Sequence, residues 1–85
     1  MTTANITLFG ADWCGDCIRS KALLDARSID YNYVDLIATP EQADVAQAIS
    51  GRTSIPVITF PDGSHQVEPS NAELESKLRS LGILV

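Results

Sequence analysis

The sequence contains no cluster of basic residues and no long apolar segment. Its six Lys and Arg are scattered among eleven Asp and Glu, and the formal net charge is −5. Because an acidic surface repels phosphate backbones and anionic lipids, we expect neither nucleic acid nor a membrane surface as a partner. The apolar stretches are a few residues long, whereas a membrane-spanning helix needs about 20 apolar residues.

Potential metal ligands are also scarce, since the chain has only two cysteines and one histidine. A structural zinc site needs about four ligands, so we expect no bound metal and no other bound cofactor. Residues 1–5 lack the basic start and the apolar run of a signal peptide, which predicts a cytoplasmic protein. Thiols are kept reduced in that compartment, and a pair of cysteines there is more often catalytic or metal-binding than a permanent disulfide.

The 85 residues are enough for one small domain, which we assign to residues 1–85. The hydrophobic fraction of 45% and the charged fraction of 20% are typical of globular proteins. The sequence shows no repeat and no linker, and we expect a monomer.

Apolar runs and turn residues predict seven secondary-structure elements. Strands are expected at residues 6–9, 31–36, 57–60 and 65–67, and helices at residues 14–28, 40–50 and 71–81. The first strand, helix and second strand should form a right-handed crossover between parallel strands. The Asp62-Gly63 turn should join an antiparallel pair. The order β-α-β-α-β-β-α therefore predicts an α/β protein with a mixed four-stranded sheet and helices on both faces.

Helical spacing and capping residues suggest how these helices start and pack. In the first helix, Ile18, Ala22, Ala26 and Ile29 roughly follow one apolar stripe, and in the second Val45 and Ile49 share a face. Thr39 with Gln42, and Ser70 with Glu73, have the spacing of capping boxes. Gly51 and Gly82 are placed to end the second and third helices in a left-handed conformation.

The segment Cys14-Gly15-Asp16-Cys17 lies where the first strand gives way to the first helix. A helix N-terminus presents unpaired N–H groups and about half a positive charge, and both favour a thiolate over a thiol. We therefore expect Cys14 to be the exposed nucleophile, and Cys17, one turn later, to be the more buried resolving thiol. The alternatives are a permanent disulfide bridge or half of a zinc site.

Two thiols at this spacing suit the two steps of thiol–disulfide exchange. The first thiolate attacks a substrate disulfide and forms a mixed disulfide. The second thiol then expels the reduced product, and its proximity makes that step effectively unimolecular.

Three segments together resemble the glutaredoxin branch of the thioredoxin superfamily. They are residues 11–17, the pair Ile55-Pro56 before a strand, and residues 62–64. The resemblance covers residues 5–82 and implies a thioredoxin-like fold of the glutaredoxin type. It also implies that Pro56 is preceded by a cis peptide bond opposite the nucleophile, and that the Ile55 backbone pairs with an incoming thiol or peptide. The alternative is a trans proline that merely starts a strand.

Within that branch, the Trp-Cys-Gly-x-Cys form, residues 52–56 and the pair Pro69-Ser70 are similar to the mycoredoxins, which work with the small thiol mycothiol. The implied function is a thiol–disulfide oxidoreductase that reduces protein disulfides or mixed disulfides with a small thiol. Mycothiol is the preferred co-substrate and glutathione the second choice, with a reductase system to regenerate it. The alternatives are a redoxin recycled by thioredoxin reductase, such as an electron donor to ribonucleotide reductase, or an iron–sulfur-binding glutaredoxin.

Four further residues are candidates for substrate binding. Trp13 would form an apolar rim beside the nucleophile, or else pack beneath the loop. Lys21 would stabilise the thiolate or hold a carboxylate, and Arg52 would pair with an anionic thiol, unless both are solvated. Ser70 starts a helix whose N–H groups could receive a carboxylate, although simple capping is the alternative.

Asp12 and Asp16 run against this chemistry, because nearby negative charge disfavours a thiolate. Asp16 stands where glutaredoxins commonly have tyrosine, and Gly15 where they often have proline. These departures weaken the case for glutathione as the natural thiol. If both aspartates point into water, their effect is small.

Overall fold

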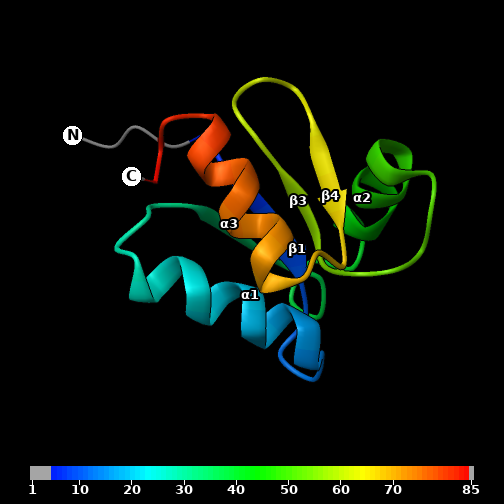
Figure 1. Cartoon of the computed structure of the whole chain (residues 1–85). Coiled ribbons are helices and arrows are strands. Elements are labelled where there is room, and N and C mark those ends of the chain that lie inside the picture. Colours follow the sequence, from blue (N-terminus) through cyan, green and yellow to red (C-terminus); the bar gives the residue numbers. More distant parts are fainter. Residues whose placement is uncertain (1–4, 85) are drawn as a thin grey trace.

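The computed structural model of the chain describes residues 5–84 and shows the predicted element order (Figure 1). The strands are β1 (Thr7–Gly10), β2 (Asn32–Asp35), β3 (Val57–Thr59) and β4 (His65–Val67), and the helices are α1 (Gly15–Ala26), α2 (Gln42–Ser50) and α3 (Asn71–Ser80). Each expected element is present, with boundaries that differ from the expected ones by at most two residues.

The four strands form one mixed sheet in the order β2-β1-β3-β4. β1 pairs with β2 in parallel, as the crossover through α1 requires, and β3 pairs antiparallel with both β1 and β4. The turn at Gly63, which has a φ of 87°, joins β3 to β4. The predicted mixed sheet is therefore confirmed.

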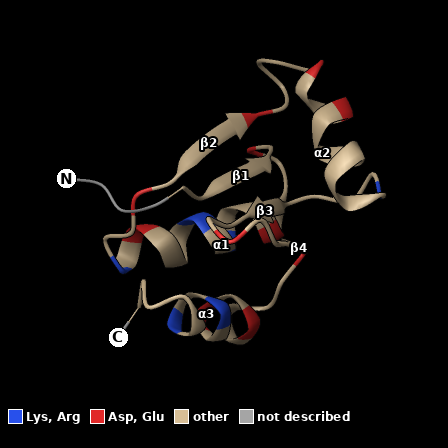
Figure 2. Ribbon diagram, turned by 90° about the horizontal axis from the view of Figure 1, so that it is seen from above, with Lys and Arg blue, Asp and Glu red and all other residues tan. Residues whose placement is uncertain are grey.

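The helices cover both faces of this sheet, with α1 and α3 on one side and α2 on the other (Figure 2). Since side chains alternate along a strand, β1 serves two cores. Leu8 belongs to the larger cluster with α1 and α3, whereas Phe9 packs with Ala46 of α2 and Val57 of β3. The fully buried members of the larger cluster are Ile6, Leu8, Leu24, Ile58, Leu74 and Leu78.

The predicted apolar stripe of α1 is wrong for most of its length. Ile18 is 52% exposed, and Ala22 and Ala26 are also exposed. The helix instead buries the face that carries Cys17, Ser20, Leu23 and Leu24. A thiol and a hydroxyl occupy half of that face, so the apolar pattern of the sequence does not mark it.

The expected start and packing of α2 also need correction. The Thr39 hydroxyl donates a hydrogen bond to the Asp35 carbonyl at 2.9 Å, so no Thr39–Gln42 capping box forms. Val45 and Ile49 do share a face, but that face is exposed. The helix packs on the sheet through Ala46, whose small side chain permits close approach.

The other capping predictions are confirmed. Ser70 and Glu73 form a complete capping box at the start of α3. Gly51 and Gly82 each have a φ of 73°, the left-handed conformation expected where a helix ends. Across residues 5–84, no helix is long and apolar enough to cross a membrane.

Candidate active site

Cys14 caps the N-terminus of α1 with its sulfur. Its backbone is extended, with φ −89° and ψ 113°, and its Sγ accepts a hydrogen bond from the Cys17 N–H at 3.1 Å. The turn before it is closed by the Cys14 N–H, which donates to the Ala11 carbonyl at 3.2 Å. The positive end of the helix dipole thus lies at the sulfur atom.

Cys17 lies one turn further along α1 and is completely buried, whereas 7% of Cys14 is exposed. Burial, and then a hydrogen bond between the two thiols, raise the pKa of Cys17 to about 12. Cys17 is therefore a neutral thiol at physiological pH. Cys14 is the more accessible of the two, but the prediction that it is exposed is wrong, because both thiols are buried in the structure.

Gly10, at the end of β1, gives the Cys17 sulfur its space. A Cβ atom at this position would lie 2.8 Å from Cys17 Sγ, closer than such atoms approach in proteins. The sequence pattern marked Gly10 only as the end of a strand. A glycine in a strand does indicate close approach of another group, but not which group approaches.

The loop before β3 lies against the nucleophile. The Ile55–Pro56 peptide bond is cis, as the family resemblance predicted. The Cys14 thiol donates to the Ile55 carbonyl over a long distance of 3.8 Å. The Pro56 carbonyl in turn accepts a hydrogen bond of 3.0 Å from the Glu68 N–H, which joins this loop to the chain after β4.

An open groove of about 430 Å³ gives access to the Cys14 side chain. Trp13 is 72% exposed at this groove, so it is a surface residue and does not pack under the loop. The groove is lined by Trp13, Cys14, Gly15, Asp16, Thr53, Ser54, Ile55 and Glu68. It can receive a thiol or an extended peptide next to the sulfur.

Four of the six candidate binding residues do not line this groove. Pro56 is fully buried. The Lys21 ammonium lies over the Tyr33 ring, 3.7 Å from its centroid. Arg52 lines a neighbouring small hollow against α2, which shares Thr53, Ser54 and Ile55 with the groove. The Ser70 hydroxyl accepts a hydrogen bond from the Glu73 N–H at 3.1 Å, so it caps α3.

The two acidic residues near the motif differ in their surroundings. Asp16 forms an ion pair of 2.8 Å with Arg19, which also donates to the Pro69 carbonyl at 2.8 Å. That guanidinium offsets the Asp16 charge beside the groove. Asp12 is exposed to solvent, where its field is screened.

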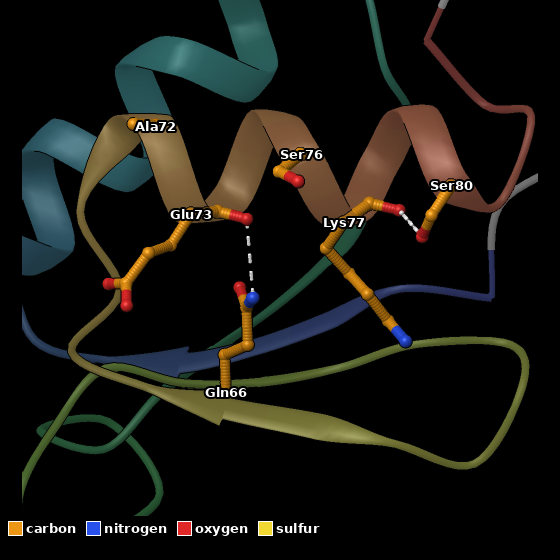
Figure 3. A pocket seen from close by; sticks show the side chains of 6 residues that line it. All are labelled: Gln66, Ala72, Glu73, Ser76, Lys77 and Ser80. Carbon is orange, nitrogen blue, oxygen red and sulfur yellow. Dashed lines mark hydrogen bonds between the residues drawn. The ribbon is translucent and has the colours of Figure 1, made fainter.

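A second hollow lies between β4 and α3 and is lined by Gln66, Ala72, Glu73, Ser76, Lys77 and Ser80 (Figure 3). Two of these residues are joined across the hollow, since the Gln66 side-chain amide donates a hydrogen bond of 3.3 Å to the Glu73 backbone carbonyl. The hollow contains no cysteine, and the thiol chemistry is confined to the first groove. Within residues 5–84, no three His, Cys, Asp or Glu side chains are arranged to hold a metal ion.

Comparisons with known proteins agree with this geometry. The family model described as Glutaredoxin matches residues 6–66. A protein of Mycobacterium tuberculosis that is named as a glutaredoxin is 35% identical over 79 residues, which cover 92% of this chain and 94% of that protein. Mycoredoxin 1 of Corynebacterium glutamicum is 27% identical, covering 92% of this chain and 98% of its own.

Among solved structures, the glutaredoxin of Archaeoglobus fulgidus superposes with a TM-score of 0.76 at 23% identity, covering 91% of this chain and 88% of its own. This similarity confirms the thioredoxin-like fold. The family match and the close cysteine pair together give the activity. The chain belongs to the glutaredoxin family of thiol–disulfide oxidoreductases.

Proposed function

We propose that Cys14 is the nucleophile and Cys17 the resolving thiol in the reduction of protein disulfides and of mixed disulfides between proteins and a small thiol. The observation that carries this proposal is the position of the Cys14 sulfur. It lies beside an open groove, 3.1 Å from the Cys17 N–H, with the Ile55 carbonyl on its other side.

In the first step, the Cys14 thiolate attacks one sulfur of the substrate disulfide. The substrate S–S bond breaks, a bond to Cys14 forms, and the departing thiolate takes up a proton. The helix N-terminus stabilises the negative charge on Cys14 before the attack.

In the second step, Cys17 loses its proton and attacks the Cys14 sulfur, which releases the reduced product and leaves a Cys14–Cys17 disulfide. Because burial raises the pKa of Cys17 to about 12, little of it is ionised at neutral pH. The small ionised fraction of Cys17 is offset by its position one turn away, since an intramolecular thiol acts at a high effective concentration. Small thiols then reduce the disulfide and return the protein to its dithiol form.

We assign substrate binding to the groove surface at Trp13 and Ile55, with the buried Pro56 and its cis peptide bond positioning the Ile55 backbone. The exposed indole of Trp13 offers apolar contact area, and the Ile55 backbone can pair with an extended substrate. Lys21 and Arg52 lie outside the groove and are left without a direct role in this step.

The preferred small thiol is mycothiol, with a reductase system that regenerates it. Two observations support this choice. Mycoredoxin 1 is a relative over nearly the whole chain, and, of the residues described, no Lys or Arg lines the groove to hold the carboxylates of glutathione. Mycothiol carries no carboxylate. We place the reaction in the cytoplasm and expect the protein to act as a monomer.

A Cys17→Ser variant tests the proposal, because it should stop after the first step and hold the substrate on Cys14. Mass spectrometry of the trapped protein should show a mixed disulfide, and the added mass identifies the small thiol. The Cys14→Ser variant is the matched control and should trap nothing. Recycling of the oxidised wild-type protein by thioredoxin reductase alone would overturn the small-thiol assignment.

A further inference from the structure

Glu68 is the acidic residue of the Cys14 groove whose charge is not offset by a neighbour. Two acidic residues line the groove, Asp16 and Glu68. Asp16 is paired with Arg19 at 2.8 Å. The ion pairs and hydrogen bonds found within residues 5–84 include no partner for the Glu68 carboxylate. The groove next to the nucleophile therefore carries an uncompensated negative charge.

The basic residue found beside this groove is Arg19, which is held by the Asp16 carboxylate and by the Pro69 carbonyl, each at 2.8 Å, and forms no ion pair with Glu68. Lys and Arg lie on and around α1 and α3, and one follows α2 (Figure 2). Lys21 lies over an aromatic ring, and Lys77 pairs with Asp62 at 2.8 Å. Arg52 lines the hollow next to the groove, against α2, and not the groove itself. Of the residues that the structure describes, no Lys or Arg lines the groove itself, and none forms an ion pair with Glu68.

The backbone holds Glu68 in this place despite an unfavourable conformation. Its φ is 48°, in the left-handed region that favours glycine and costs a residue with a Cβ atom about 1–2 kcal/mol. Its N–H donates to the Pro56 carbonyl at 3.0 Å, so the residue is anchored to the loop that faces Cys14. Residues in such conformations are concentrated at functional sites.

From this placement we propose that Glu68 selects substrates by charge, and that the natural substrate disulfide has a positively charged group close to it. This inference rests on the proposed role of Cys14 as nucleophile. A cation next to the disulfide is attracted to the Glu68 carboxylate as the disulfide approaches the sulfur, and an anion there is repelled. Neutral disulfides feel neither effect.

A set of three small disulfides measures this selection directly. Cystamine carries two positive charges, bis(2-hydroxyethyl) disulfide none, and 3,3′-dithiodipropionate two negative charges. The second-order rate constant of reduced wild-type protein with each gives a ratio of cationic to anionic reactivity. In Glu68→Gln this ratio should fall by about three- to tenfold at low salt, the size expected for one solvent-exposed charge at short range. The fall should shrink in 0.5 M NaCl, because the Debye length is then only about 4–5 Å.

Asp30→Asn is the matched control variant, since it removes one negative charge at the other end of α1. Asp30 is exposed in the segment after this helix, whose 12 residues span about 18 Å. The reactivity ratio of this variant should equal that of the wild type. Comparing each variant with the wild type removes the intrinsic reactivity differences between the three disulfides.

A second variant separates charge from backbone conformation. Glu68→Gly removes the same charge but suits the left-handed φ, so it should lower the ratio as much as Glu68→Gln does. An unchanged ratio in both Glu68 variants, or an equal fall in Asp30→Asn, would overturn the inference. If wild-type protein does not reduce even the neutral disulfide, the proposed function fails and charge selection fails with it.

Discussion

Two helices of this protein begin in nearly the same way, and the difference between them separates a stabilising cap from a reactive one. Before α1 stands Cys14, and before α3 stands Ser70, each with an extended backbone. Each uses its side chain to accept a hydrogen bond of 3.1 Å from the N–H three residues later.

The third helical residue makes the difference. In α3, Glu73 reaches back and accepts a hydrogen bond of 2.8 Å from the Ser70 N–H, which completes the box. In α1 the same position is Cys17, whose thiol forms a hydrogen bond with the Cys14 sulfur instead. The spacing Ser-x-x-Glu thus satisfies two backbone donors, while Cys-x-x-Cys brings two sulfurs together. Sulfur is a weak acceptor, so the α1 cap stabilises less and keeps its electron pair available for attack.

The largest expected effect comes from replacing the sulfur cap by an oxygen cap. Cys14→Ser should lose turnover to the uncatalysed rate, because a hydroxyl at this position is not ionised. It should retain or slightly raise the free energy of unfolding relative to the reduced wild type, because serine is a good N-cap residue. Disulfide reduction assays and urea unfolding in reductant measure both. Retained turnover would contradict the assignment of Cys14, and a large loss of stability would contradict the comparison of the two caps.

The next largest effect is the change of the unfolding free energy with pH that the ionisation of Cys17 causes. Its pKa rises from an ordinary value of 9 in the unfolded chain to about 12 in the folded protein, chiefly through burial. The unfolded chain therefore releases this proton at lower pH, so the stabilisation is complete below pH 9 and is lost progressively as the pH rises towards 12.

The effect of Cys17 on the unfolding free energy is best measured between about pH 9 and 10, because the tyrosines do not yet ionise there. Burial also raises the pKa of Tyr31, from 10 to about 12. Tyr31 therefore lowers the unfolding free energy only above pH 10. Between pH 9 and 10, reduced Cys17→Ala should lose less unfolding free energy than the reduced wild type. Equal slopes for the two proteins would show that Cys17 ionises as readily in the folded protein as in the unfolded chain.

A third, smaller effect tests the oxygen cap. Ser70→Ala should lower the free energy of unfolding by about 1 kcal/mol, since one backbone donor of α3 loses its partner. Chemical denaturation measures this loss, and the KM for a small disulfide is the second readout. If KM rises while stability stays the same, Ser70 contacts substrate, as the sequence interpretation allowed, and is not mainly a cap.

The sequence predicted those features that depend on local signals. The order of elements, the mixed sheet, the Ser70 cap and the left-handed turn at Gly51 each follow from a few neighbouring residues. The placing of Cys14 at a helix start needed only the strand before it and the helix after it. The cis bond before Pro56 came from the family resemblance, not from the residues themselves.

Features that depend on tertiary contacts were missed or misplaced. The inner face of α1 includes Ser20 and Cys17, so hydrophobicity alone points to the wrong side of the helix. Lys21 has helical spacing to the cysteines, yet its ammonium group lies over the Tyr33 ring on β2 and not at the Cys14 groove. The role of Glu68 at the groove depends on a hydrogen bond to a residue 12 positions earlier in the chain, which no local pattern reveals.

The smallest expected effect separates geometry from charge in the α3 cap. Glu73→Gln keeps an oxygen that can accept from the Ser70 N–H, so the box should persist. What is lost is the favourable interaction of a negative charge with the positive end of the helix, about 0.3–1 kcal/mol at low ionic strength. Unfolding free energies in low salt and in 1 M NaCl measure it, because salt should bring the variant and the wild type together. If the difference does not depend on salt, the hydrogen bond itself has been weakened.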